Sequence, residues 1–218
     1  MQMKNRGRLA REIAGHLLQI NAIKLNAETP FTWASGLRAP IYCDNRLSLS
    51  FPLVRDAIAD ALTEIVRQDF PDAEIIAGVA TGAIAHGVLV AERLNLPFLY
   101  VRSAPKAHGL ESRIEGKFGA GQKVVVIEDL ISTGKSSLAA CSALQAEGLE
   151  LLGMAAIFSY ELEAARKNLG SAGFPVNTLS NYPAILEVAV EKGYIPYDGL
   201  EMLESWRKDP EGWSELHQ

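Results

Sequence analysis

The sequence has little cysteine, no excess of positive charge and no long hydrophobic run. Its two cysteines, Cys43 and Cys141, are too few and too unpatterned for a disulfide framework or a zinc site. The net charge of −5 and isoelectric point of about 5.5 argue against broad electrostatic binding to nucleic acid or an anionic membrane. No apolar run approaches the ~18 residues of a membrane span, and residues 1–25 scatter charges among apolar residues, unlike a leader peptide. We therefore expect a cytoplasmic protein with neither a nucleic-acid nor a membrane partner.

The length and composition suit one folded unit. With 218 residues, 48% of them hydrophobic, the chain can bury a sizeable core. It contains no internal repeat and no low-complexity tract. We expect a single domain over residues 1–218, divided into an N-terminal helix with extended segments (1–48), a core sheet (72–195) that contains a long loop (103–121), and a C-terminal tail (196–218).

Apolar segments suited to strands alternate with helical patterns through most of the chain. Apolar residues at helical spacing over 9–20 predict an amphipathic first helix, and residues 30–45 read as extended segments around a turn. Ser50 is expected to cap a second helix that carries Pro52 in its first turn. The later strands are expected at 75–80, 98–101, 124–128, 151–158 and 176–180, and the later helices at 83–94, 135–147, 161–169 and 183–192. This alternation predicts an α/β fold with a mostly parallel central sheet flanked by helices on both faces.

The most informative segment is VVVIEDLISTGKSS, at residues 124–137. Its first four residues are β-branched without alternation, as in a strand covered on both faces, and Glu128 and Asp129 follow at the carboxyl end. The hydroxyl-rich stretch 131–136 then opens a helix, where free N–H groups can hold a phosphate. The carboxylates would repel a phosphate, so their expected partners are ribose hydroxyls or a divalent cation. The segment predicts a site for a phosphorylated sugar at the carboxyl edge of the sheet.

Two familiar phosphate motifs do not fit this segment. A P-loop needs a glycine five residues before Gly134, where this chain has Asp129, and a dinucleotide fingerprint needs three spaced glycines. A second short stretch, GVATGA at residues 78–83, leaves the first central strand and enters a helix. Its main-chain amides are placed to approach an anion, although a tight strand-to-helix connection explains it equally well. His86, one turn into that helix, is expected to be packed rather than catalytic.

A long basic segment separates two of the expected strands. Residues 103–121 contain four glycines and no convincing strand, and loops of this length in compact domains are usually functional or disordered. Residues 102–123 carry five Lys or Arg against two Glu, a local charge of +3 within an acidic chain. A small anionic substrate fits this charge better than a polymer does.

Residues 124–137 closely resemble the phosphoribosyl pyrophosphate (PRPP) signature of type I phosphoribosyltransferases. Residues 31–46 are similar to the N-terminal hood of orotate phosphoribosyltransferases, and residues 102–109 to their mobile catalytic loop. Residues 157–163 also resemble bacterial members, so that the resemblance runs from about residue 20 to about residue 195. It implies the type I phosphoribosyltransferase fold with a hood and a flexible loop. It further implies transfer of the 5-phosphoribosyl group from PRPP to orotate, giving orotidine 5′-monophosphate and pyrophosphate in pyrimidine synthesis.

The resemblance also implies roles for individual residues. Glu128 and Asp129 would bind the ribose 2- and 3-hydroxyls, residues 130–136 would wrap the 5-phosphate, and residues 78–83 would form the pyrophosphate loop. The full expected PRPP-binding set is Ala80, Thr81, Arg102, Lys106, His108, Glu128, Asp129, Leu130, Ile131, Ser132, Thr133, Gly134, Lys135 and Ser136.

The expected catalytic residues are Arg102, Lys106 and His108, because the departing pyrophosphate needs cations near it. His108 either donates a proton to the leaving group or only a hydrogen bond. The resemblance implies a homodimer in which this loop closes over the neighbouring subunit's site. Mg²⁺ is expected to bridge the diphosphate oxygens, and no protein ligand for the metal is assigned.

The expected orotate contacts are Ser132, Phe31 and Tyr160, while Trp33 either stacks on the base or packs within the hood. The chain departs from many relatives in having Ala34 and Ser103 in place of lysines, and from some in having Tyr160 in place of arginine. The missing positive charge would come from elsewhere, with Arg38 and Lys24 as the candidates.

Two other functions share parts of this pattern. A purine-type phosphoribosyltransferase would carry the signature with a different hood. A non-catalytic PRPP-binding regulator is disfavoured by the acidic isoelectric point and by the Lys106/His108 pair.

Overall fold

A six-stranded sheet forms the centre of the molecule. In the computed structural model, which describes residues 3–26, 28–33, 35–104, 112–197 and 199–217, the strand order is β10-β9-β8-β5-β6-β7. Neighbouring strands are parallel except for the edge pair β6–β7. The strands are β5 (Ile75–Val79), β6 (Phe98–Val101), β7 (Ile114–Glu115), β8 (Lys123–Ile131), β9 (Glu150–Ser159) and β10 (Val176–Asn181). The predicted α/β fold with a mostly parallel sheet is thus confirmed.

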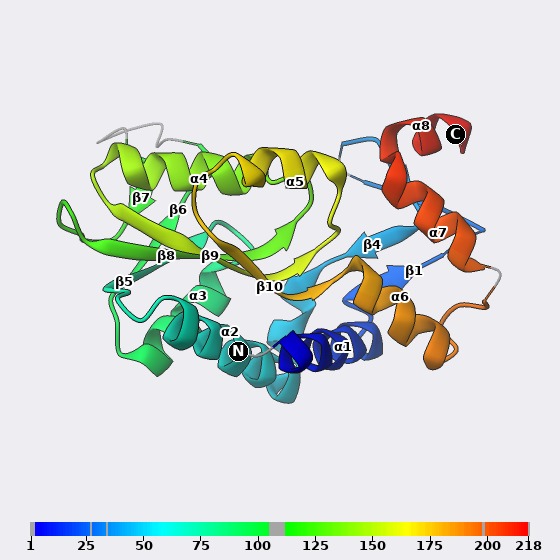
Figure 1. Cartoon of the computed structure of the whole chain (residues 1–218), viewed down its shortest axis with the longest axis horizontal. Helices are drawn as coiled ribbons and strands as arrows, with labels where there is room; N and C mark the ends of the chain where they lie inside the picture. The colour runs from blue at the N-terminus through cyan, green and yellow to red at the C-terminus, as the bar shows by residue number, and fades with distance from the viewer. Residues whose placement is uncertain (1–2, 27, 34, 105–111, 198, 218) are drawn as a thin grey trace.

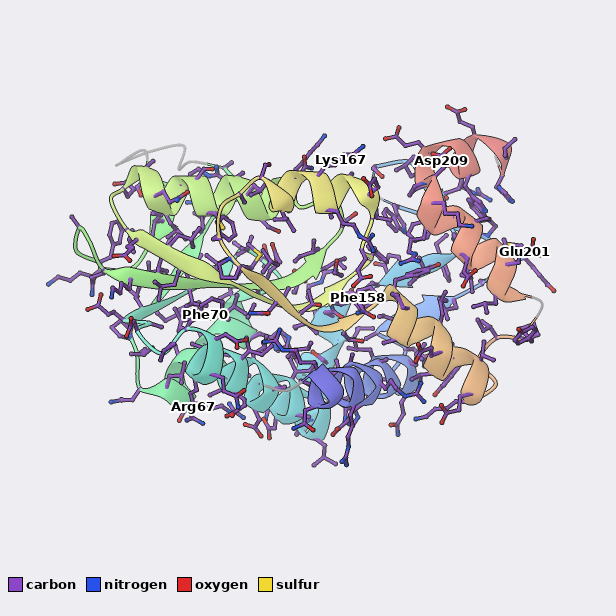
Figure 2. All side chains as sticks on the ribbon, viewed as in Figure 1. Arg67, Phe70, Phe158, Lys167, Glu201 and Asp209 are labelled. Atoms are coloured by element: carbon purple, nitrogen blue, oxygen red, sulfur yellow. The ribbon has the colours of Figure 1, made fainter. Side chains whose placement is uncertain are left out.

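Helices cover both faces of this sheet (Figure 1). One face carries α1 (Met3–Gln19), α2 (Pro52–Asp69) and α3 (Ile84–Leu94), and the other carries α4 (Lys135–Ala146) and α5 (Glu163–Gly170). A further helix, α6 (Tyr182–Glu191), packs against α1. Phe70 and Phe158 lie buried between the layers, whereas Arg67 and Lys167 point outward from the helices (Figure 2). Within the described ranges, no helix combines the length and apolar character that crossing a bilayer requires.

The hood is built from two short antiparallel pairs and a 3₁₀ helix. Strand β1 (Ile23–Leu25) pairs with β4 (Ile41–Cys43), and β2 (Phe31–Thr32) pairs with β3 (Arg38–Ala39). The 3₁₀ helix η1 (Asn45–Ser50) then leads into α2. This order confirms the extended segments expected for residues 30–45 and places the hood at one end of the sheet.

The C-terminal helices α7 (Gly199–Lys208) and α8 (Pro210–Leu216) pack on the hood. The main-chain N–H of Arg38 donates to the hydroxyl of Ser214 at 2.9 Å. Trp206 is 1% exposed, and its ring lies 5.6 Å from each of the rings of Trp33 and Tyr160. The C-terminal helices are therefore part of the packed core of the hood.

Three local predictions need correction. Ser50 does not cap α2, because it ends η1, and the N-cap is Phe51, which makes no side-chain capping bond. Residues 103–121 were expected to lack a strand, yet β7 forms there by antiparallel pairing with β6. Strand β8 ends at Ile131 rather than at 128, because its last residues still pair with β9. The two strand differences arise from pairing with another strand, whereas the η1 helix ends through a local bond from the Phe51 N–H to the Ser48 carbonyl.

Candidate active site

Strand β8 extends beyond its neighbour β5 and leaves one side of its carboxyl end open. The β5 pairing stops at Gly78↔Ile127, whereas the β9 pairing continues to Ile131↔Ser159. Ligands of open α/β sheets bind at such a carboxyl edge. A cavity of about 480 Å³ lies there, which we call the edge cavity. Its walls come from the end of the hood (Cys43, Asp44 and Arg46), from residues 79–82, and from the signature (Glu128, Asp129, Leu130, Ser132, Thr133 and Ser136).

Most of the expected PRPP-binding residues are brought together at this cavity. Eight of them line it: Ala80, Thr81, Glu128, Asp129, Leu130, Ser132, Thr133 and Ser136. Three neighbours do not: the Ile131 side chain is 1% exposed and faces a different cavity, Gly134 is the N-cap of α4, and Lys135 is exposed to solvent. Their binding roles remain predictions.

The expected catalytic residues are only partly visible. Lys106 and His108 lie outside the described residues. Arg102 follows β6 directly, and its Nη1 lies 3.4 Å from Oε1 of Glu115 in β7. Arg102 does not line the edge cavity, so its predicted contact with PRPP requires its side chain to turn from Glu115 toward the substrate.

The three expected orotate contacts lie in different surroundings. Ser132 lines the edge cavity. The ring of Phe31 lies in the hood, 6.0 Å from that of Tyr42, and does not line it. Tyr160 is 2% exposed and stacks on Trp33 at 5.2 Å, which is the packing alternative expected for Trp33. Tyr160 does not line the edge cavity. Its role as an orotate contact remains a prediction.

The two candidates for the missing positive charge also differ in position. Lys24 lies on β1 with an exposed side chain. Arg38 lies on β3, and its buried Nε has no hydrogen-bond partner among the described residues. Neither lines the edge cavity, so both remain candidates.

The side chain of Glu128 is almost completely buried, with 3% of its surface exposed. Its two oxygens accept hydrogen bonds from the hydroxyl of Ser137 at 2.7 Å and from the main-chain N–H of Asp129 at 3.0 Å. Burial, together with the charge of Asp129, raises the pKa of Glu128 from 4.5 to about 8. This carboxyl is therefore mostly protonated at pH 7, and hydroxyl groups that donate to it favour its ionised form.

Asp129 is held between the two loops that line the cavity. A Cβ atom on residue 82 would overlap the Asp129 carboxylate, so this approach needs glycine at position 82. The main-chain carbonyl of Asp129 accepts a hydrogen bond at 2.6 Å from Nδ2 of Asn45, on the side where β5 no longer provides a partner. Asn45 thus holds the main chain of Asp129, and Gly82 leaves room for its carboxylate beside residue 82.

A buried polar chain continues from Asn45 into α3. The hydroxyl of Ser48 donates to the Asn45 carbonyl at 2.6 Å and lies 3.2 Å from Nε2 of His86. Because the Ser48 proton is already donated, Nε2 carries the ring proton, and Nδ1 is a buried lone pair with no partner among the described residues. Burial lowers the pKa of His86 to about 4, so the ring is neutral at pH 7. The expectation that His86 is packed is confirmed.

Residues 132–136, the phosphate loop from here on, present free main-chain donors at the start of α4. The first helical bond runs from the N–H of Leu138 to the Gly134 carbonyl. In the described part of the chain, no acceptor is found for the N–H groups of residues 132–135. Such donors at a helix N-terminus are suited to a phosphate dianion.

Several residues at the site were not assigned by sequence reasoning. Cys43, Asp44 and Arg46 line the cavity, and Asn45 supports Asp129. All four lie at the end of the hood-like segment 31–46. The resemblance therefore pointed to the right segment but did not identify which of its side chains lie at the site. Ser137, the hydrogen-bond partner of Glu128, lies in α4 just after the phosphate loop. Nothing in the sequence distinguished it from other helical serines.

The carboxylates at the cavity are few. The described residues contain no group of three or more His, Cys, Asp or Glu side chains that could hold a metal ion by themselves. Asp44 forms an ion pair with Arg46 at 2.7 Å, whereas the Asp129 carboxylate lies beside Gly82 at the cavity wall. This donor set suits a cation that takes most of its ligands from phosphates and water.

Comparison with known proteins gives consistent matches. Residues 49–171 match the family model of the phosphoribosyl transferase domain. An orotate phosphoribosyltransferase from Bacillus cereus is 52% identical over 207 residues, covering 94% of this chain and 99% of that protein. One from Streptococcus gordonii is 51% identical over 205 residues, covering 94% and 98%. The solved structure of the Aeropyrum pernix orotate phosphoribosyltransferase matches with a TM-score of 0.73 at 28% identity, covering 84% of this chain and 99% of that one.

Proposed function

The chain belongs to the phosphoribosyltransferase family, and we propose that it transfers the 5-phosphoribosyl group of PRPP to orotate in pyrimidine nucleotide synthesis. The observation that carries this proposal is the open end of β8, where Glu128 and Asp129 face a cavity bordered by free N–H groups of the phosphate loop. A pentose carrying a terminal phosphate matches this pair of binding groups. The alternative purine-type and regulatory functions have no comparable support in the hood or in the charge of the chain.

The reaction follows from the arrangement of these groups. The phosphate loop would hold the 5-phosphate, and Glu128 and Asp129 would accept hydrogen bonds from the ribose hydroxyls. The stretch 80–82 would face the diphosphate through main-chain amides. Orotate N1 then forms a bond to C1 and gives up its proton to pyrophosphate or water, as the bond from C1 to the pyrophosphate oxygen breaks and the leaving group keeps that electron pair. Stabilising that departing charge is the main requirement of the step.

We propose Mg²⁺ as the cofactor, because the site offers few carboxylates and the substrate supplies phosphate oxygens. Asp129 is the residue best placed to contribute a carboxylate, directly or through water. When bound, the ion would neutralise part of the diphosphate charge.

We also propose that Arg102, Lys106 and His108 act on the diphosphate and that they do so across a homodimer. Support for an interface comes from apolar side chains exposed on η1 and at the start of α2, at Leu47, Phe51 and Leu53, of which Leu53 is 87% exposed. Mixing a Lys106→Ala subunit with an Asp129→Asn subunit tests this arrangement. Regained activity supports shared sites, whereas a mixture no more active than its parents places the loop on its own subunit. A cytoplasmic location also remains a proposal, which cell fractionation would check.

The proposed activity is tested by supplying PRPP and Mg²⁺ with orotate, adenine or xanthine and following product formation. Orotate alone should be converted. Asp129→Asn should weaken PRPP binding by about 1–3 kcal/mol, because a charge-assisted hydroxyl contact is lost. Conversion of a purine in preference to orotate would overturn the substrate, and PRPP binding without any turnover would favour the regulator.

A further inference from the structure

The short helix α5 supports the phosphate loop from behind. Nδ2 of Asn168 donates a hydrogen bond to the main-chain carbonyl of Thr133 at 2.8 Å. The next residue, Leu169, packs against Gly134, and a Cβ atom on residue 134 would lie 3.0 Å from Cγ of Leu169. The side of the loop that faces away from the substrate is therefore formed by two consecutive residues of α5.

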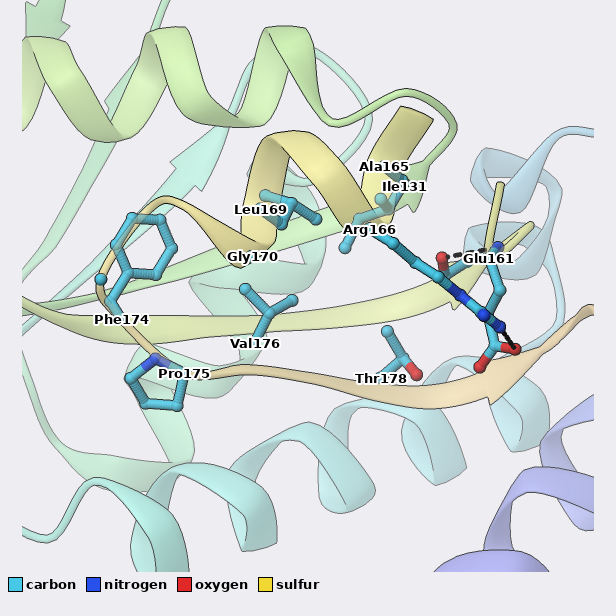
Figure 3. Close-up of a pocket in the computed structure, with 12 residues that line it drawn as sticks. Ile131, Glu161, Ala165, Arg166, Leu169, Gly170, Phe174, Pro175, Val176 and Thr178 are labelled. Carbon is cyan, nitrogen blue, oxygen red and sulfur yellow. Dashed lines mark hydrogen bonds and ion pairs between the residues drawn. The ribbon is translucent and has the colours of Figure 1, made fainter. Parts of the chain in front are cut away.

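This support matters because α5 is otherwise lightly attached to the sheet. Ala165 is the buried residue of the helix. A second cavity, of about 580 Å³, separates α5 from β10, and Ala165 and Leu169 point toward it (Figure 3). Ile131, just before the phosphate loop, also lines this second cavity, whereas the loop residues Thr133 and Ser136 line the edge cavity. The contacts from Asn168 and Leu169 hold the side of the loop that faces α5.

The Asn168 hydrogen bond fixes the orientation of one peptide group. In a trans peptide the C=O and the following N–H point in opposite directions. Because the Thr133 carbonyl points to Asn168, the Gly134 N–H points away from α5. That N–H has no acceptor in the described chain, and its neighbours Thr133 and Ser136 line the edge cavity. By binding the Thr133 carbonyl, the Asn168 amide thus keeps the Gly134 N–H pointing away from α5, where it can donate to an anion.

Gly134 itself adopts a left-handed conformation, with φ of +77°. Its lack of a side chain lets Leu169 cover the loop closely, which separates the main-chain donors from the second cavity.

We propose that Asn168 is a positioning residue for the phosphate loop, orienting the Thr133–Gly134 peptide so that its N–H binds the 5-phosphate of the substrate. This inference rests on the proposed function and adds a residue that touches no substrate atom. It makes binding of the 5-phosphate depend on α5, and it leaves the pyrophosphate side of the site independent of Asn168.

The test compares Asn168→Ala with the wild type in two binding titrations and one kinetic assay. Ribose 5-phosphate, which needs the phosphate loop, should bind about tenfold more weakly, as expected for one hydrogen bond. Pyrophosphate should bind with unchanged affinity. The KM for PRPP should rise by a similar factor, while the KM for orotate stays the same. Asn168→Gln, which keeps an amide donor, should recover part of the loss.

Asn177→Ala is the matched control. Its Nδ2 donates to Asp69 Oδ2 at 3.2 Å toward α1 and α2, on the sheet face opposite α5, so it should leave both affinities unchanged. Equal weakening of ribose 5-phosphate and pyrophosphate by Asn168→Ala, with a lower Tm than the control, would show a general structural role and overturn the inference. Unchanged ribose 5-phosphate binding would overturn it as well. A wild type that converts no orotate would instead contradict the proposed function, so the two failures are distinguishable.

Discussion

Replacing Glu128 with glutamine should remove a large part of the pH dependence of folding stability. The pKa of Glu128 is raised to about 8 in the folded chain, chiefly by burial, from 4.5 in the absence of the fold. The folded state therefore holds this proton over a pH range in which the unfolded chain has lost it. The resulting stability is complete below pH 4.5 and is lost as the pH rises through 8.

The size of the effect follows from the two pKa values. At about 1.4 kcal/mol per pH unit, the folded wild type should lose about 3 to 4 kcal/mol of unfolding free energy from this residue between pH 5 and pH 8. Glu128→Gln cannot ionise, so it should lack this component. Its absolute stability also changes, because the amide cannot accept both hydrogen bonds that Ser137 and Asp129 donate. The slope against pH is therefore the informative quantity.

Urea unfolding of both proteins at several pH values between 5 and 8 measures this slope. Titrating groups that do not interact with Glu128 contribute equally to the two curves and cancel in the difference. A difference that grows by several kcal/mol in favour of Glu128→Gln supports the reasoning. Parallel curves would show that Glu128 ionises normally in the folded chain and would refute it.

Three further outcomes are expected. Gly82→Ala should raise the KM for PRPP at least about tenfold, because the new methyl group displaces the Asp129 carboxylate; an unchanged KM in steady-state assays would contradict the contact. Asn45→Ala should also raise the KM for PRPP, whereas Thr63→Val, which removes a buried hydroxyl bond within α2, should lower Tm without that change. Equal KM values for PRPP in these two variants would show that Asn45 does not support PRPP binding. Trp206→Ala should lower the free energy of unfolding by about 3–5 kcal/mol, because a ring that is 1% exposed leaves a cavity among Trp33 and other aromatics. A loss below 1 kcal/mol in urea unfolding would show that α7 is not part of the core.

The sequence predicted those features that depend on local pattern. Continuous β-branched residues placed β8, and the two acids followed by small hydroxyl residues placed the phosphate loop at its carboxyl end. The features it missed depend on distant contacts. The length by which β8 extends beyond β5 depends on where β5 ends. Asn45 donates to the Asp129 carbonyl, which lies beyond the last residue of β8 that pairs with β5. Tyr160 shows the same limit, because its burial depends on Trp206, 46 residues further along the chain.

The close approach of Gly82 to Asp129 has an evolutionary consequence. The two residues lie 47 positions apart in the chain, yet a side chain added at position 82 would overlap the carboxylate of Asp129. Mutational libraries that vary the two segments separately should therefore yield mostly inactive proteins, and new specificity should appear only when both are varied together. Paired randomisation around positions 80–82 and 128–130 would be the productive way to redesign which sugar phosphate this scaffold accepts.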